Sequence, residues 1–210
     1  MNIVKLFGKL LPVKRSVPKP QMVLFGLGNP GEKYHNTRHN IGFRIIDALE
    51  GDLEKKCVVK GVANSLLVWG SLANRVAVLV KPQTFMNRSG EAVRDSLNFY
   101  GVSLSECLVV VDDFNLPFGT VRFRKGGSHG GHNGLKSIAA LAGTQYPRLR
   151  VGVGPLPPKI AVIDFVLGEF SEQEEQILQK LIPETVKAVR YYLDNGIDQA
   201  MNRFNSVVID

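Results

Sequence analysis

Short apolar runs recur along the chain and are separated by segments with helical periodicity. The runs are rich in β-branched residues and cover residues 22–27, 66–69, 76–80, 108–111, 121–123 and 149–153. Runs this short and this apolar are typical of buried strands. We therefore predict a β-sheet built from these segments.

Three helices are predicted between the strands. Residues 40–50 place apolar side chains on one face and end at Gly51. Residues 89–100 begin at Ser89, which we interpret as an N-cap, and end at Gly101, while residues 133–141 end before Gly143. Serine at a helix start and glycine just past its end satisfy backbone groups that have no partner inside the helix.

A longer helix is predicted near the end of the chain. Ser171 and Glu174 have the spacing of a capping box, and helical periodicity follows as far as residues 195–196. Pro183 lies inside this segment and is expected to kink it.

This alternation of strands and helices predicts the fold class. We expect a single α/β domain with a twisted, mostly parallel (mixed) β-sheet covered by helices on both faces. Residues 121–124 alternate apolar with basic side chains, which favours an edge strand with one face in water.

Composition and charge add a boundary near residue 21. The chain has 210 residues, of which 44% are hydrophobic, enough for one well-packed domain. Its net charge is +7, but the 26 basic residues include five in an acid-free start, at Lys5, Lys9, Lys14, Arg15 and Lys19. The remaining 21 basic and 19 acidic residues leave +2, so a polyanion site must be a local patch. We predict a basic N-terminal extension over residues 1–21 and a domain over residues 22–210.

Cysteine usage and hydropathy bear on the cellular compartment. Cys57 and Cys107 are far apart and follow no signal-type apolar segment, which favours the reducing cytoplasm without a disulfide. An organelle is the alternative if residues 1–21 belong to a transit segment. No run approaches the roughly 20 apolar residues of a membrane span, so no membrane association is expected.

Polar side chains follow three of the predicted strands, at Asn29, Asn87 and Asp112. The carboxyl ends of parallel strands share one edge of a sheet, so these side chains should lie together. His39 comes just before a helix start, whose dipole is expected to keep the imidazole neutral at pH 7. Asp112 is the expected carboxylate partner of His39, and the adjacent Asp113 competes for that role.

These residues favour hydrolysis with water as the nucleophile. Histidine with an aspartate behind it removes a proton from water, and asparagine amides donate to a developing oxyanion. Serine chemistry is disfavoured because there is no Gly-x-Ser-x-Gly elbow, and neither cysteine has a polar, glycine-rich context. Residues 26–31 match a dinucleotide fingerprint, but the polar stretch after them delays the helix to about residue 40.

A zinc hydrolase is a further alternative. His129 and His132, together with His35 or His39, would supply imidazole ligands. No paired cysteine or glutamate ligands accompany them, so we favour an enzyme without metal.

Residues 126–134 form a second dense motif, with five glycines in nine residues. Such backbone approaches a ligand closely, and Asn133 then offers an amide at a helix start; a plain flexible loop is the alternative. Basic residues flank this loop at Arg122, Arg124, Lys125, Lys136, Arg148 and Arg150. Such a cluster suits the binding of phosphates. The alternative is the ordinary solvated face of an edge strand.

Four motifs, at residues 26–40, 81–90, 111–117 and 127–134, resemble the bacterial-type peptidyl-tRNA hydrolase family. The resemblance covers about residues 22–205. It implies hydrolysis of the ester that joins a peptide's C-terminus to the terminal ribose of tRNA, which recycles tRNA from abandoned translation. It also implies a monomeric α/β domain without a metal or another cofactor.

The same resemblance implies roles for individual residues. His39 resembles the general base, and Asp112 the carboxylate that keeps it basic. Asn29 matches an asparagine that helps to distinguish N-blocked from free aminoacyl-tRNA. Positions that hold the acceptor end or the peptide match Tyr34, Phe85, Asn87 and Asn133, and positions of basic phosphate contacts match Arg122, Arg124 and Arg150.

Two departures from the family pattern are present. Asn115 stands where many members have a second aspartate, and residues 1–21 have no counterpart in compact members. We expect Asn115 to matter little. The alternative function is a non-catalytic RNA-binding relative, since a plant organelle splicing factor shares this fold and the acid-free start of the chain is compatible with it. The complete set of His39, Asp112, Asn29 and Asn87 favours catalysis.

Overall fold

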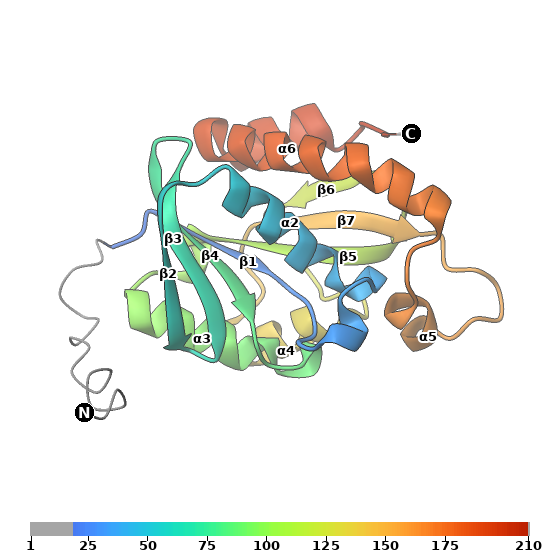
Figure 1. The fold of residues 1–210 in the computed structure, drawn as a ribbon, viewed down its shortest axis with the longest axis horizontal. Coiled ribbons are helices and arrows are strands. Elements are labelled where there is room, and N and C mark those ends of the chain that lie inside the picture. Colours follow the sequence, from blue (N-terminus) through green and yellow to red (C-terminus); the bar gives the residue numbers. More distant parts are fainter. Residues whose placement is uncertain (1–18, 210) are drawn as a thin grey trace, which may run out of the picture.

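A seven-stranded mixed sheet forms the centre of the molecule, in the strand order β2-β3-β4-β1-β5-β7-β6 (Figure 1). The computed structural model describes residues 19–209. The predicted extension over residues 1–21 therefore lies outside the described residues, apart from its last three. The strands are β1 (Met22–Gly26), β2 (Glu54–Val62), β3 (Ser65–Leu72), β4 (Arg75–Pro82), β5 (Cys107–Pro117), β6 (Val121–Arg124) and β7 (Arg148–Gly154).

The four central strands run parallel, and the outer strands run antiparallel to their neighbours. β1 pairs in parallel with β4 and β5, and β5 pairs in parallel with β7. The β2–β3, β3–β4 and β6–β7 pairs are antiparallel. The prediction of a mixed sheet is confirmed, with parallel pairing confined to the four central strands.

Helices cover both faces of this sheet, as predicted. α2 (Ile41–Gly51) and α6 (Glu172–Phe204) pack on one face, and α3 (Ser89–Tyr100) and α4 (Asn133–Ala142) pack on the other (Figure 1). Successive β1 residues serve the two faces, since Leu24 packs with the α2 and α6 side chains and Phe25 with those of α3 and α4. Burial on both faces explains why the central strands are continuously apolar.

Two elements were not predicted from the sequence. β2 is an edge strand whose apolar residues are interrupted by lysines, and Val58 is 55% exposed. α5 (Val162–Leu167) has only six residues, too few for a periodic pattern. Short 3₁₀ turns also connect the elements: η2 (Glu32–Tyr34), η3 (Arg38–Asn40), η4 (Met86–Arg88) and η5 (Leu104–Glu106).

β6 lies at the edge of the sheet, as its alternating pattern predicted. Its burial alternates along the strand, and it pairs only with β7 among the described strands. The side chain of Asn205, just after α6, accepts from the backbone N of Phe123 at 2.7 Å and donates to its carbonyl oxygen at 3.2 Å. This amide therefore satisfies backbone groups on the open side of β6, where a further strand would otherwise pair.

The ends of α3 and α4 differ in part from the prediction. The prediction that Ser89 caps α3 is wrong, because Ser89 lies inside the helix and its hydroxyl donates to the carbonyl oxygen of Met86 at 2.8 Å. Gly101 ends α3 with a φ of 63°, as expected for a left-handed C-cap. α4 begins at Asn133, but its N-cap is His132.

The capping box of Ser171 and Glu174 at the start of α6 is confirmed. The predicted end at residues 195–196 coincides with a break in the helix, after which a further helical stretch runs to Phe204. Its backbone leaves helical dihedral angles at Gly196 (φ 82°, ψ 175°) rather than at Pro183. Glycine adopts a positive φ at little cost, which allows the chain to turn there and resume the helix.

Candidate active site

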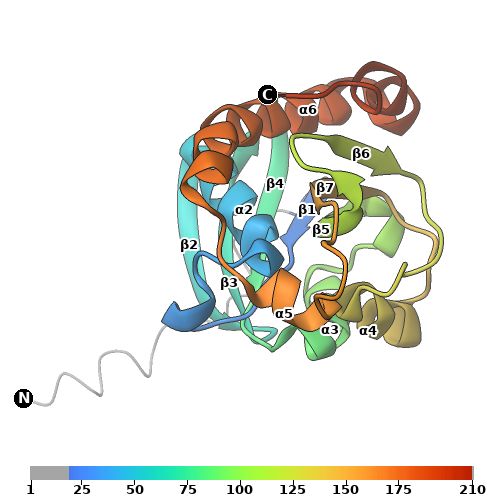
Figure 2. The same ribbon diagram turned by 90° about the vertical axis from the view of Figure 1, so that its right-hand side faces the viewer.

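A cavity of about 450 Å³ opens at the carboxyl ends of the parallel strands. Figure 2 looks onto this end of the sheet, with α5 in front of the strand ends. Asn29, Asn87 and Asp112 all line the cavity, which confirms the prediction that they share one edge of the sheet. Four apolar side chains of α5 form another part of its wall: Val162, Ile163, Val166 and Leu167.

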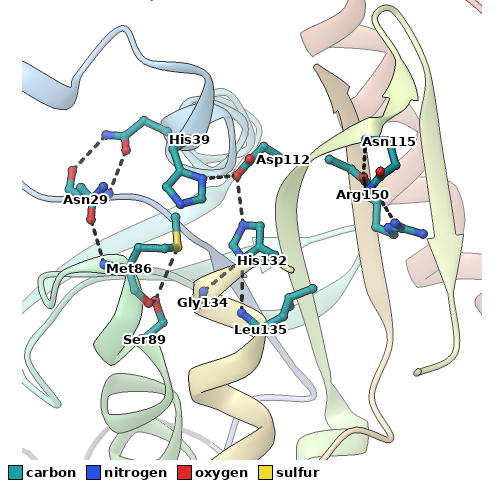
Figure 3. A network of polar contacts seen from close by, with 12 residues as sticks. Asn29, His39, Met86, Ser89, Asp112, Asn115, His132, Gly134, Leu135 and Arg150 are labelled. Carbon is teal, nitrogen blue, oxygen red and sulfur yellow. Dashed lines mark hydrogen bonds and ion pairs between the residues drawn. The ribbon is translucent and has the colours of Figure 1, made fainter. Parts of the chain in front are cut away.

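Three buried side chains form a hydrogen-bonded group at the base of the cavity (Figure 3). Nδ1 of His39 lies 2.8 Å from Oδ1 of Asp112, and Nε2 of His132 lies 3.0 Å from the same oxygen. Each of the three residues is less than 10% exposed. The expected pairing of His39 with Asp112 is present, whereas Asp113 makes no contact of this kind with His39.

The hydrogen-bond partners assign the protons on both imidazoles. Nδ1 of His132 accepts from the backbone N–H groups of Gly134 (3.1 Å) and Leu135 (3.3 Å), so it carries no proton. Nε2 of His132 therefore donates to Asp112. His39 also donates to this carboxylate, through Nδ1, so Nε2 of neutral His39 has a free lone pair that points away from Asp112.

Burial and charge act against each other at this group. Burial lowers the pKa of His39, but the charge of Asp112 and its hydrogen bond raise it, and the net pKa lies above 6.5. Burial alone would raise the pKa of Asp112, yet the two histidines hold it well below its usual range. The net direction is opposite to the lowering of the His39 pKa that was expected from the helix dipole, because the charge and hydrogen bond of Asp112 together outweigh burial.

Asn29 is held by three contacts at the start of the cavity. Its Oδ1 accepts from the backbone N of Met86 at 2.8 Å. Its backbone N donates to Oδ1 of Asn40 at 2.8 Å, and Nδ2 of Asn40 donates to its carbonyl oxygen at 2.9 Å. Because Oδ1 is occupied by Met86, the amide Nδ2 of Asn29 is the group that remains for a ligand.

The glycine turn that carries Asn29 is explained by packing. A Cβ at Gly26 would lie 2.2 Å from the carbonyl oxygen of Gly42, so β1 and α2 approach too closely for any other residue. The turn is followed by η2 and η3, and α2 begins only at Ile41. The expected delay of the helix is confirmed, and no helix N-terminus lies where a pyrophosphate would need one.

The remaining predicted ligand residues lie around the mouth of the cavity. Asn87, Asn133 and the 54% exposed Phe85 line it. Tyr34 is not part of the lining, but its ring meets that of Phe85 edge-on, with centroids 6.3 Å apart. Tyr34 therefore extends the exposed aromatic surface of Phe85 away from the cavity.

Of the three predicted arginines on the β6–β7 ladder, Arg150 lines the cavity, whereas Arg122 and Arg124 are not among its lining residues. Arg122 of β6 stands opposite Arg150 of β7 in register, and Arg124 stands opposite the buried Arg148. Like charges in such cross-strand positions repel each other. None of the ion pairs among residues 19–209 involves Arg122 or Arg124, whereas Arg150 is paired with Asp113.

Asn115 completes the surroundings of Asp113. Its backbone N and side-chain Nδ2 both donate to Oδ1 of Asp113, at 2.9 and 3.3 Å. An aspartate at this position would replace the amide donor with a second negative charge. The asparagine therefore leaves Asp113 free to pair with Arg150.

His39, Asp112 and His132 also have the composition of a metal site, with ligand atoms within 4.8 Å of one another. Ligand atoms around a tetrahedral zinc ion stand about 3.3 Å apart, given bonds of about 2.0 Å. The histidine nitrogens lie 2.8 and 3.0 Å from the carboxylate oxygen, which fits direct hydrogen bonds better. His129, another residue of the zinc alternative, instead accepts from the backbone N of Gly131 at 3.1 Å.

Sequence analysis missed two parts of this site. His132 was considered only as a metal ligand, although its place directly before Asn133 at a helix start was a usable signal. The wall formed by α5 had no signal beyond a short apolar segment. Both parts approach His39 only because distant segments of the chain pack together.

Comparison with known proteins identifies the family. The family model for peptidyl-tRNA hydrolase matches residues 23–209. A peptidyl-tRNA hydrolase of Fervidobacterium nodosum is 44% identical over 188 residues, which cover 90% of this chain and 98% of that protein. One from Chloroflexus aurantiacus is 46% identical over 185 residues, covering 87% and 98%.

Solved structures give the same result. The crystal structure of peptidyl-tRNA hydrolase from Acinetobacter baumannii matches with a TM-score of 0.83 at 30% identity, covering 91% of this chain and 98% of that one. A uridine phosphorylase from Vibrio fischeri shares only the fold, with a TM-score of 0.51 at 8% identity. On its sequence and structural matches, the chain belongs to the peptidyl-tRNA hydrolase family.

Proposed function

We propose that this chain hydrolyses peptidyl-tRNA by cleaving the ester between the peptide and the terminal ribose, with His39 as the general base. The observation that carries the proposal is the pairing of buried His39 with Asp112 at 2.8 Å, which leaves Nε2 of His39 free beside the cavity. A general base must have such a lone pair within reach of water. Family membership supplies the substrate class.

In the proposed reaction, Nε2 of His39 removes a proton from water as the oxygen attacks the ester carbonyl. Asp112 stabilises the imidazolium that forms. The amide Nδ2 of Asn29 donates to the oxyanion of the tetrahedral intermediate, because its Oδ1 is held by Met86. His39 then returns the proton to the ribose oxygen, which leaves as a hydroxyl. The peptide leaves as a carboxylic acid, which releases its remaining proton to water.

The surroundings of the cavity suggest where each part of the substrate binds. The apolar side chains of α5 suit the peptide, while Phe85, Asn87 and Asn133 suit the acceptor end. The opposed arginines Arg122 and Arg150 suit a backbone phosphate, since an anion between them would relieve their repulsion.

We also propose that the chain acts as a monomer, because its own fold brings Asn29, His39 and Asp112 to one cavity. Cys57 and Cys107 are both free, in line with work in a reducing cytoplasm. Among the described residues, no helix is both long enough and apolar enough to cross a membrane.

The test is release of free tRNA from N-acetyl-aminoacyl-tRNA by the purified chain and by His39→Ala, each with and without a chelator. We expect wild-type turnover that the chelator does not change, and a loss of about 10²- to 10⁴-fold in the variant. Binding of tRNA without turnover would instead favour the non-catalytic RNA-binding alternative. Loss of turnover with the chelator would favour the metal site.

A further inference from the structure

Arg38 connects the segment of His39 to the separate wall of the cavity formed by α5. It is the first residue of η3, directly before His39 and Asn40, both of which make contacts of the candidate site. Its side chain is only 13% exposed and extends toward the α5–α6 connection. None of the roles assigned above uses this side chain.

Both the backbone and the side chain of Arg38 hold that connection. Its backbone N donates to the carbonyl oxygen of Gly168 at 3.0 Å, and Nη1 donates to that of Glu169 at 2.8 Å. Nη2 donates to both carboxylate oxygens of Glu174, at 3.0 and 2.7 Å. The guanidinium carbon lies 4.7 Å from the ring centroid of Phe165 in α5.

α5 has few other means of staying in place. It is a six-residue helix with no side-chain N-cap, and helices of this length are unstable by themselves. Only Phe165 and Val166 of α5 are buried, while Ile163 is 61% exposed. The position of α5 therefore depends on a small set of tertiary contacts, and Arg38 makes several of them.

We propose that Arg38 is a positioning residue that fixes α5 against η3 and so sets the distance between the apolar wall and His39. The inference rests on the proposed function and deepens it, because that wall would grip the peptide of peptidyl-tRNA. Arg38 touches no substrate in this role and acts through α5. A loosened wall weakens the grip on the peptide while the base and its carboxylate stay paired.

The chain offers a matched control in Arg44, one helical segment later. Arg44 is 22% exposed and makes a bidentate ion pair with Glu175, next to the partner of Arg38 on α6. Its guanidinium carbon lies 5.6 Å from the ring centroid of Phe170, and both Glu175 and Phe170 lie outside α5. Arg38→Met and Arg44→Met therefore remove the same charge and a similar ion pair, and only the first releases α5.

The experiment compares these two variants with wild type in steady-state hydrolysis of N-acetyl-aminoacyl-tRNA, with free tRNA as a competitive inhibitor. For Arg38→Met we expect KM to rise by about 10-fold, since the apolar grip weakens, with kcat within about 2-fold of wild type. The inhibition constant of free tRNA and the acidic limb of the pH-rate profile should not change. Arg44→Met should match wild type in every one of these quantities.

Hydrogen exchange provides a readout that does not depend on turnover. Amides of α5 should exchange faster in Arg38→Met than in wild type or Arg44→Met. Local opening of α5 costs less free energy in this variant, because the contacts of the Arg38 side chain are already absent. Arg38→Lys keeps the charge but not the planar, bidentate geometry. It should therefore fold, with a KM between those of wild type and Arg38→Met. It serves as the test variant if Arg38→Met does not fold.

Equal KM values and equal α5 exchange in the Arg38 and Arg44 variants would overturn the inference. So would a raised tRNA inhibition constant in Arg38→Met, because Arg38 would then act on tRNA. Failure of the proposed function looks different, since wild type and Arg44→Met would then release no tRNA at all. The exchange comparison would still decide whether Arg38 holds α5.

Discussion

Replacing Asp112 with asparagine tests the proposed catalytic group most directly. The carboxylate accepts hydrogen bonds from two histidines, at 2.8 and 3.0 Å from the same oxygen, and it is 3% exposed. Asparagine keeps the shape of the side chain but removes its charge. It also offers one acceptor oxygen and one NH₂ group to two N–H donors.

The size of the effect follows from these contacts. A hydrogen bond to a charged group contributes about 1.5 to 3 kcal/mol, which the imidazolium of His39 would lose as it forms in the transition state. If the NH₂ group of asparagine faces His39, Nδ1 of His39 must accept a hydrogen bond and the imidazole proton moves to Nε2. In that tautomer, Nε2 cannot accept a proton from water. Restoring the active tautomer against this hydrogen bond adds about 1 to 3 kcal/mol to the activation free energy. Together these terms predict a fall in kcat of about 10²- to 10⁴-fold.

The assay is the pH dependence of kcat/KM for N-acetyl-aminoacyl-tRNA hydrolysis. Asp112 raises the pKa of His39 above 6.5 in the wild type, and burial acts to lower it. A base must be unprotonated to act, so activity falls below this pKa. In Asp112→Asn only burial acts on the pKa of His39 and lowers it. The acidic limb of the pH profile should therefore move to lower pH, and the kcat/KM on the plateau should fall.

Asp113→Asn is the matched control, because it makes the same chemical change one residue away. Asp113 pairs with Arg150 and accepts from Asn115, so this variant should leave the acidic limb in place. An unmoved limb in Asp112→Asn together with a moved limb in Asp113→Asn would refute the reasoning. Retention of more than about a tenth of wild-type kcat in Asp112→Asn would also refute it.

Four other outcomes are expected. His39→Ala should lose about 10²- to 10⁴-fold in kcat yet bind tRNA as wild type does, and a rate above about a tenth of wild type would contradict the assignment. Asn29→Asp should lower kcat by about 10²- to 10³-fold and reduce the preference for N-acetyl-aminoacyl-tRNA over aminoacyl-tRNA, since a free ammonium would meet a carboxylate. Charge removal at Arg122 and Arg124 together should raise KM more than it lowers kcat and flatten the salt dependence of tRNA affinity, by somewhat under one log–log unit for each lost phosphate contact. Because folding lowers the pKa of Asp112, its contribution to stability is complete above its ordinary value of 3.8 and is lost as the pH falls. Urea unfolding should therefore show a steeper loss of stability in wild type than in Asp112→Asn as the pH falls below 3.8.

Local physical chemistry in the sequence determined the main elements and the edge of the sheet that carries the site. Strands buried on both faces must be continuously apolar, so β1 and β5 were visible as runs. Gly101 and the pair of Ser171 and Glu174 marked helix ends by the hydrogen bonds that they satisfy. Because the carboxyl ends of parallel strands meet, the chain order alone placed Asn29 and Asp112 together.

The tertiary structure decided which side chains meet at that edge. Asp112 and Asp113 are adjacent and chemically alike, and only the packing of β5 directs the first to the histidines and the second to Arg150. His132 is 93 residues from His39 along the chain, so no local pattern connects the two.

The same reason applies to β2, α5 and the contacts of Arg38. β2 is an edge strand that is not required to be apolar, and α5 is too short to have a period. Arg38 reads as an ordinary exposed cation until α5 and α6 fold over it. Periodicity and capping act within one element, whereas the protonation of His39 and the position of α5 depend on contacts between elements, which exist only in the folded chain.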